Sequence, residues 1–299
     1  MLKHNVLTVQ VNFQYGPNVF VPYSVGALQA YANMLPEIRE SFHFQEPIFL
    51  RKDPIEVVKS IENPAIICFS SYLWNWEYNK TLAKLMRLAF PKCLIVFGGT
   101  QVPNASESFF VEHPYVDILV HHEGELAFRE VLLEYLSVRP NYSKIAGLSV
   151  RVEGNKTLKT EKGGRIKDLS KLPSPYLSGV FDFLIGRGYA LNVSQETNRG
   201  CPYSCTFCDW GGSSFDKFYR FDGGRILEEN EWFGRNKVEY VFNCDANYGI
   251  IERDYELTRK MVEIRARHGG YPRKFRMCTA KNSNDRIFQI VKLLNDADM

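Results

Sequence analysis

Three cysteines, Cys201, Cys205 and Cys208, stand close together in the sequence, four and then three positions apart. Thiolates at this spacing can surround one face of a cube-shaped iron–sulfur cluster. A [4Fe–4S] cluster has four irons, so three cysteine ligands leave one iron open to a small molecule. That open position distinguishes a catalytic cluster from one that only transfers electrons. The spacing therefore predicts a [4Fe–4S] cluster with chemistry of its own.

The other cysteines leave two alternatives open for this loop, a zinc site and a purely structural group of thiols. A structural zinc site normally needs four protein ligands, and Cys244 or Cys278 would have to supply the fourth. Both lie in or beside strand-like runs, as Cys68 and Cys93 do, where free cysteines are usually inert. The total of seven is odd and unevenly spaced, which argues against a disulfide framework and indicates a reducing compartment.

The composition is that of an ordinary globular protein, with 45% hydrophobic and 24% charged residues. The net charge is only +3, and the 37 basic residues are scattered among 34 acidic ones without a polybasic block. We therefore expect neither a nucleic acid nor a membrane surface as the partner. Residues 1–14 do not read as a signal peptide, and no apolar run approaches the ~18 residues of a membrane helix. These features predict a cytoplasmic protein.

Residues 1–140 alternate strand-like and helix-like patterns. Most of the strand-like runs are apolar throughout, as buried parallel strands are. These runs cover 6–11, 42–50, 65–70, 93–97 and 116–120. The alternation predicts an α/β domain with a doubly wound parallel sheet covered on both faces. Ligands of such sheets bind beyond the carboxyl ends of the strands. The corresponding segments here are 12–18, 70–75, 98–104 and 121–125.

The pattern changes after this region. Residues 141–188 contain a β-hairpin pattern at 148–160 and a Pro-Ser-Pro segment, and we interpret them as a linker. A second α/β pattern fills residues 189–299. Each strand-like run in it is followed by a helix, either directly or after a loop. The runs are 189–194, 238–243 and 275–279. The cysteine loop follows the first of them directly, at the end of a strand where α/β barrels carry their chemistry.

The cysteine loop resembles the signature of the radical S-adenosylmethionine (SAM) family, C-x3-C-x-aromatic-C after the first barrel strand, with Phe207 as the aromatic residue. The resemblance implies that the three cysteines bind the cluster, that SAM chelates the fourth iron, and that Phe207 contacts the adenine. It covers residues 189–299 and implies a partial (β/α) barrel, about half of the family's usual one. We therefore expect a truncated chain that alone binds SAM weakly and turns over slowly.

The same resemblance assigns two further residues to SAM. Asp245 follows the second strand, where an acidic residue of similar enzymes accepts hydrogen bonds from the SAM ammonium group. The family's more usual Gly-Gly-Glu is absent, and the alternative is that Asp245 and Asn247 only shape a turn. Lys281 follows the third strand and is expected to pair with the SAM carboxylate, or alternatively to be a solvated lysine.

The first domain resembles the cobalamin-binding, Rossmann-like domain found upstream of many radical SAM enzymes. The resemblance implies cobalamin contacts at the strand ends, where small residues let a corrin approach the backbone. The residues concerned are Ser70, Ser71, Leu73, Gly98, Gly99, Thr100, Glu123 and Gly124. Many such domains carry D-x-H-x-x-G after the first strand, but residues 12–18 contain no His and no Asp. We therefore expect cobalamin without a protein histidine on cobalt, or no cobalamin at all.

Together these resemblances imply an enzyme that cleaves SAM reductively to a 5′-deoxyadenosyl radical and transfers a methyl group from cobalamin to an unactivated carbon. The expected substrate is a small molecule or a peptide, and the expected electron donor is of the flavodoxin or ferredoxin type. Two alternatives stay open. One is a cobalamin-associated radical enzyme that catalyses a rearrangement or cyclisation without methylation, and the other is an inactive, truncated binding protein.

Overall fold

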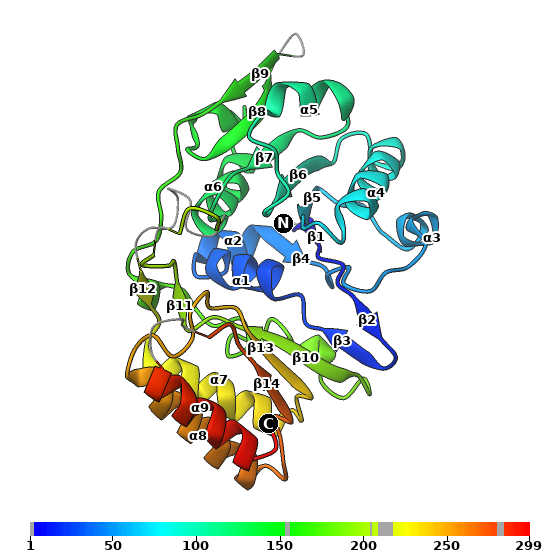
Figure 1. Ribbon diagram of the computed structural model, residues 1–299. Helices are drawn as coiled ribbons and strands as arrows, with labels where there is room; N and C mark the ends of the chain where they lie inside the picture. Colours follow the sequence, from blue (N-terminus) through cyan, green and yellow to red (C-terminus); the bar gives the residue numbers. More distant parts are fainter. Residues whose placement is uncertain (1–2, 153–155, 204, 209–217, 280–283) are drawn as a thin grey trace. The chain divides into compact units, whose positions relative to one another are not determined.

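The computed structural model describes residues 3–152, 156–203, 205–208, 218–279 and 284–299. The chain forms two compact units, each assembled from two separate stretches of sequence (Figure 1). The first unit comprises Met1–Gln14 and Ser24–Arg165, and the second comprises Tyr15–Tyr23 and Ile166–Met299. A short N-terminal segment, Tyr15–Tyr23, therefore belongs to the same unit as the C-terminal half of the chain. The domain boundaries that we expected, at 140 and 189, did not assign this segment to the second domain.

The first unit is built on one mixed sheet in the order β4-β1-β5-β6-β7-β8-β9. Its strands are β1 His4–Val9, β4 Phe42–Phe44, β5 Ile66–Ser70, β6 Leu94–Gly98, β7 Ile118–Val120, β8 Leu148–Val152 and β9 Lys156–Lys159. The pairs from β4 to β7 are parallel, while β8 and β9 are antiparallel. The predicted parallel sheet is confirmed, and the chain order places the topological switch between β1 and β5, where ligands of open α/β sheets bind.

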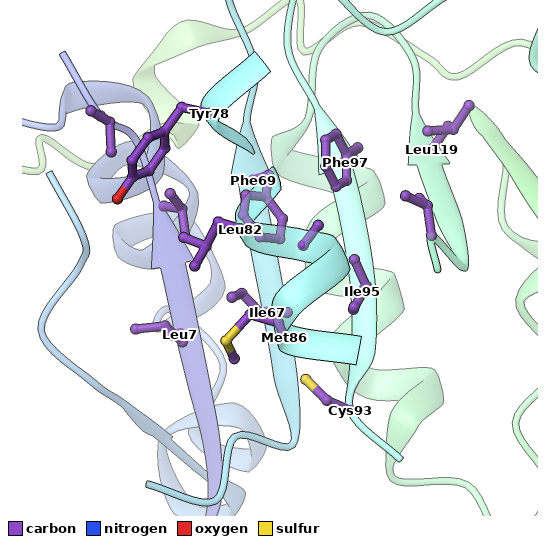
Figure 2. Packing of buried hydrophobic residues seen from close by; sticks show 14 of the residues in the cluster. Leu7, Ile67, Phe69, Tyr78, Leu82, Met86, Cys93, Ile95, Phe97 and Leu119 are labelled. Carbon is purple, nitrogen blue, oxygen red and sulfur yellow. The ribbon is translucent and has the colours of Figure 1, made fainter. Parts of the chain in front are cut away.

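Helices cover both faces of this sheet. They are α1 Tyr23–Ala32, α2 Pro36–Ser41, α3 Pro54–Lys59, α4 Trp76–Ala89, α5 Ser106–Glu112 and α6 Glu125–Tyr135. Every residue of β5 is buried, and its side chains alternate between two cores. Ile67 and Phe69 pack with Leu82 and Met86 of α4 on one face (Figure 2). Ile66 and Cys68 pack with α6 on the other face, which explains the continuous apolar run in the sequence.

We expected the hairpin at 148–160 to be part of a linker. It instead completes the first sheet. β8 pairs antiparallel with β7, with Leu148 opposite Val120, and β9 pairs with β8. Leu148 and Val150 are thereby buried in the same core as β7. This burial of apolar side chains against β7 is the physical reason that the boundary of the first unit lies near residue 165.

The second unit carries a sheet in the order β14-β13-β10-β3-β2. Its strands are β2 Gln14–Tyr15, β3 Asn18–Phe20, β10 Ala190–Gln195, β13 Tyr240–Asn243 and β14 Lys274–Arg276, with a separate small ladder of β11 Asn198–Arg199 and β12 Tyr219–Arg220. Its α-helices are α7 Gly223–Arg235, α8 Arg253–Arg267 and α9 Asn284–Asp296, and it has short 3₁₀ turns at Leu169–Lys171 and Asp182–Leu184. Another 3₁₀ turn, Tyr142–Lys144, belongs to the first unit. The predicted strand–helix order of the second unit is confirmed.

β10 lies at the centre of this second sheet. It pairs in parallel with β13 on one side and with β3 on the other, so the N-terminal segment Asn18–Phe20 extends the sheet. We did not predict β3 as a strand. Asp222 at the start of α7 accepts a hydrogen bond from Arg225 N, an N-cap that fixes where this helix begins. In the part of the chain that the structure describes, none of the helices is long and apolar enough to cross a membrane.

Candidate functional site

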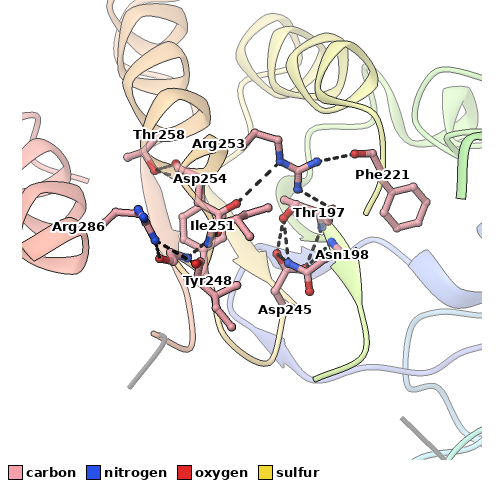
Figure 3. Close-up of polar contacts among 12 residues, drawn as sticks. Thr197, Asn198, Phe221, Asp245, Tyr248, Ile251, Arg253, Asp254, Thr258 and Arg286 are labelled. Carbon is pink, nitrogen blue, oxygen red and sulfur yellow. Dashed lines mark hydrogen bonds and ion pairs between the residues drawn. The ribbon is translucent and has the colours of Figure 1, made fainter. Parts of the chain in front are cut away.

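The loop that contains the three cysteines is closed at its base by the ladder of β11 and β12. Asn198 pairs with Arg220 and Arg199 pairs with Tyr219, which brings the two stems of the loop together just beyond β10. The Arg253 guanidinium, at the start of α8, donates to Thr197 O at 3.0 Å and also to Phe221 O (Figure 3). One cation therefore joins the residue before the loop to the residue after it, so the loop leaves the sheet at a fixed place.

Asp245, just beyond β13, fastens the first stem of the loop. Its carboxylate accepts from Thr197 N at 2.8 Å, Asn198 N at 3.1 Å and Asn198 Nδ2 at 2.8 Å, and also from the Thr197 hydroxyl (Figure 3). The side chain is only 2% exposed. Burial raises the pKa of Asp245 from 3.8 to about 7, while the hydrogen bonds from Thr197 and Asn198 act in the opposite direction.

This geometry changes the role expected for Asp245. Its oxygens are occupied by four donors of the chain itself, and the side chain is buried rather than presented to a ligand. A direct bond to the SAM ammonium group does not fit this arrangement, because a carboxylate offers about four acceptor positions in all. Asp245 instead holds the stem of the cysteine loop. The sequence indicated a functional carboxylate but not its partners, which lie 47 and 48 positions away.

The cysteines themselves differ in their surroundings. Cys201 is 7% exposed, and its Sγ accepts a hydrogen bond from Asn247 Nδ2 at 3.0 Å. Cys205 and Cys208 are half-buried, and Cys208 N donates to Cys205 O at 3.1 Å. All three are free cysteines. Phe207, between the last two cysteines, is 81% exposed. A short loop with three free thiols and an exposed aromatic ring presents a suitable donor set for an iron–sulfur cluster.

The donor set also bears on the zinc alternative. Among the described residues, no three His, Cys, Asp or Glu side chains gather as ligands of a single metal ion. A cube-shaped cluster instead binds each thiolate to a different iron, and its ligands are spread more widely than those of one ion. Lys281, which we assigned to the SAM carboxylate, lies outside the described residues.

At the strand ends of the first unit, several residues predicted to contact cobalamin are packed against one another. Ser70 and Ser71 are buried, and Ser71 N donates to Gly98 O at 2.7 Å. Asn79 Nδ2 donates to Ser71 Oγ at 3.1 Å. Gly99 has a φ of +102°, and a Cβ there would clash with the backbone of Ser71. These small residues therefore let the ends of β5 and β6 approach each other closely.

Other groups at the same strand ends are exposed. Leu73 is 78% exposed, and Gly99 and Thr100 are also exposed. Trp74 is 41% exposed, and its ring stacks on Tyr72 with 4.7 Å between centroids and 2° between planes. Phe13, beyond β1, is a third aromatic neighbour, 6.0 Å from Trp74. The sequence interpretation missed this aromatic group, although Tyr-Leu-Trp directly after a buried strand was the signal.

The remaining predicted cobalamin residues lie at the start of α6. Glu123 is paired with Arg165 at 2.9 Å, and Gly124 sits against Leu28, where an added Cβ would be 3.2 Å from the leucine side chain. His121 is buried, with Nε2 2.8 Å from Ser149 Oγ, and burial lowers its pKa to about 4. This histidine is therefore neutral near pH 7 and already hydrogen-bonded, which makes it a structural residue.

The fold and the loop together define a class of protein. An α/β unit with an exposed aromatic surface at its strand ends is joined to a second α/β unit, and three free cysteines follow the central strand of that second unit. This chain belongs to the family of cobalamin-dependent radical SAM enzymes.

Two relatives support this assignment. The chain is 43% identical over 284 residues to the cobalamin-dependent radical SAM methyltransferase TokK of Streptomyces tokunonensis, covering 94% of this chain and 41% of that protein. It is also 43% identical over 287 residues to the 2-(S-pantetheinyl)-carbapenam-3-carboxylate methyltransferase of Streptantibioticus cattleyicolor, with the same coverages of 94% and 41%. The chain thus spans about two fifths of the length of these relatives. A search against family models gave no match.

A solved structure shares the fold. The cobalamin-dependent S-adenosylmethionine radical enzyme OxsB, solved with aqua-cobalamin and S-adenosylmethionine bound, matches 99% of this chain and 42% of that chain with a TM-score of 0.68. The sequences are 16% identical, so this likeness concerns the fold alone. It extends over both units of the chain, which agrees with the α/β architecture expected from the sequence.

Proposed function

We propose that this chain forms the cofactor-binding part of a cobalamin-dependent radical SAM methyltransferase that methylates an unactivated carbon. The observation that carries the proposal is the cysteine loop, in which three free thiols follow β10 on a stem fixed by Asp245 and Arg253. The identity of 43% to two methyltransferases supports the methyl-transfer step. A carbapenam-type small molecule, as named for one relative, is the first substrate to test.

In this proposal Cys201, Cys205 and Cys208 hold a [4Fe–4S] cluster. When bound, the cluster and SAM supply a 5′-deoxyadenosyl radical for hydrogen abstraction, and cobalamin supplies the methyl group. Phe207, exposed beside Cys208, would pack on the adenine of SAM. Lys281 remains the proposed partner of the SAM carboxylate. Asp245 contributes indirectly, because it orients Thr197 and Asn198 at the base of the loop.

The first unit would act as a doubly wound, Rossmann-like cobalamin domain. The exposed side chains of Phe13, Leu73 and Trp74, with the exposed residues Gly99 and Thr100, offer an apolar surface at the switch point between β1 and β5. A corrin is a large planar group that an aromatic surface binds by stacking. Since residues 12–18 contain no histidine, cobalt would carry no histidine ligand from that loop.

The second unit would be the first part of a radical SAM (β/α) barrel, with β10 as the strand that leads into the cluster loop. A flavodoxin- or ferredoxin-type protein would reduce the cluster in the cytoplasm. A cobalamin-associated rearrangement without methylation uses the same cofactors. The two are separated by the product, since only methyl transfer adds a methyl group to the substrate.

Cofactor retention by the chain tests the proposal. The chain is incubated with hydroxocobalamin without oxygen, passed over a gel-filtration column, and its absorption spectrum is recorded. We expect the wild type to retain the corrin and Trp74→Ala to lose most of it. Phe288→Ala removes an even more exposed aromatic ring from α9 and should leave retention unchanged. A wild type that retains no corrin, or equal retention by Trp74→Ala, would reject the cobalamin surface.

A further inference from the structure

The hydrogen bond between Asn247 and Cys201 joins the connection after β13 to the first cysteine of the loop. Asn247 is 6% exposed, and its Nδ2 lies 3.0 Å from Cys201 Sγ. The two residues are 46 positions apart in the sequence, so the contact depends on the fold. An amide N–H is a donor that keeps its proton at every pH at which the protein is folded. The sulfur therefore receives this hydrogen bond regardless of pH.

The backbone on both sides of Asn247 is fixed, which directs the amide toward the sulfur. Two positions before it, Asp245 is bonded to Thr197 and Asn198. Directly after it, Tyr248 N donates to Cys278 O at 2.8 Å, and the Tyr248 hydroxyl lies 3.0 Å from Thr258 Oγ1. Asp245 and Tyr248 are therefore bonded to different parts of the chain (Figure 3). A side chain between two such anchors has little freedom to turn away.

The residues that follow strengthen this anchoring. Asp254 Oδ2 accepts from Gly249 N at 2.8 Å, and burial raises the pKa of this carboxyl. Arg286 of α9 donates to Gly249 O at 3.1 Å and to Ile250 O at 3.0 Å. The connection between β13 and α8 is thus held by the stem of the cysteine loop, by α8 and by α9. From this connection Asn247 donates a hydrogen bond to Cys201 Sγ. A segment built in this way can set the position of a thiol precisely.

A donor beside a cluster thiolate has a defined electrostatic effect. Reduction adds negative charge to the cluster and its sulfurs, so a hydrogen bond to the thiolate stabilises the reduced state more than the oxidised state. A hydrogen bond to a charged acceptor is stronger than one to a neutral acceptor, and a part of this strength separates the two redox states. Partners that hydrogen-bond metal ligands also orient them.

We propose that Asn247 is a positioning residue that holds the Cys201 thiolate and raises the reduction potential of the cluster bound there. The inference rests on the proposed function, since it requires a cluster on Cys201. This role differs from that of a residue that only shapes a turn, because such a residue would leave the reduction potential of the cluster unchanged.

Two near-isosteric variants test it, Asn247→Leu, which has no donor, and Asn247→Asp, which replaces the donor with an acceptor. Asn236→Leu is the control, since the side chain of this half-buried asparagine donates to Trp232 O of α7. Each chain is reconstituted with iron and sulfide, its iron is counted, and its potential is measured by redox titration. For both Asn247 variants we expect about a tenfold lower ratio of reduced to oxidised cluster at a fixed potential, or about 59 mV for one electron.

The outcomes are distinguishable from one another. A wild type without iron and sulfide rejects the proposed function itself. A wild type with a cluster, and Asn247 variants that assemble one at the wild-type potential, overturn the role of Asn247 alone. If neither variant assembles a cluster, the wild type labelled with 15N-asparagine decides. Pulsed EPR of its reduced cluster should show a coupling from an asparagine side-chain nitrogen, and the absence of that coupling overturns the proposal.

Discussion

Replacing Asp245 with asparagine removes a buried carboxyl group while it keeps the shape of the side chain. In the folded protein, burial raises the pKa of Asp245 from 3.8 to about 7. The folded state therefore binds a proton on this group more tightly than the unfolded state between pH 4 and pH 7. Because the folded pKa is raised, the stability that this proton provides is present at low pH and is lost as the pH rises through about 7.

The magnitude follows from the size of the shift. One pH unit inside the window corresponds to about 1.4 kcal/mol for one proton. Between pH 5 and pH 8, the contribution of Asp245 to the free energy of unfolding should fall by about 2 to 3 kcal/mol. Asparagine does not titrate, so this part of the pH dependence should be missing in Asp245→Asn. The variant also turns one acceptor into a donor against Thr197 or Asn198, which costs about 1 to 3 kcal/mol at every pH.

The assay is urea unfolding of the cluster-free chain at pH 5 and pH 8, followed by circular dichroism. The quantity of interest is the free energy of unfolding of the wild type minus that of Asp245→Asn, because other titrating groups cancel in this difference. Asp222→Asn, which removes the exposed N-cap carboxylate of α7, is the matched control for an Asp→Asn change outside the core. If the Asp245 difference is constant or rises with pH, the four donors keep the carboxylate ionised and our reasoning about burial is wrong.

Three further predictions concern other parts of the chain. Gly99→Ala should destabilise the first unit by ~3 kcal/mol, because φ at Gly99 is +102° and the added Cβ would meet the backbone. Gly164→Ala adds a Cβ in open space and should change the midpoint of unfolding little, so equal midpoints for the two variants would contradict this prediction. Cys205→Ala should abolish iron binding and Cys68→Ala, buried in the first unit, should leave the iron count intact; iron retained by Cys205→Ala would exclude its role. Burial lowers the pKa of His121 to about 4, so the wild type should lose about 1 to 2 kcal/mol between pH 7 and pH 5 relative to His121→Gln, and parallel pH profiles would refute this.

Much of the fold could be predicted because burial leaves a clear pattern in the sequence. β5 and β6 are apolar throughout, and both are buried between two layers of helices. β3 could not be recognised, since Asn18–Phe20 is short and its partner Ala190–Asn192 lies in the other half of the chain. The hairpin of β8 and β9 was recognised locally, but its pairing with β7 depends on tertiary contacts that periodicity does not contain.

The site shows the same division. Cysteine spacing is local information, and it was sufficient to select the loop that β11 and β12 close. The sequence was not sufficient to predict the role of Asp245. Whether its carboxylate faces a ligand or the chain depends on its burial and on four donors from a stem that is distant in the sequence. Ser71 was similarly ambiguous, since a small residue at a strand end serves either a ligand or a neighbouring strand. In this fold Ser71 serves the backbone at Gly98.

The most direct test of the account is a Mössbauer spectrum of the chain reconstituted with 57Fe, recorded before and after addition of SAM. We predict about four irons and as many sulfides per chain, in a [4Fe–4S] cluster in which one iron changes its isomer shift when SAM binds, because Cys201, Cys205 and Cys208 leave that iron without a cysteine ligand. Stoichiometric zinc without sulfide would contradict the account. So would a cluster whose spectrum is the same with and without SAM.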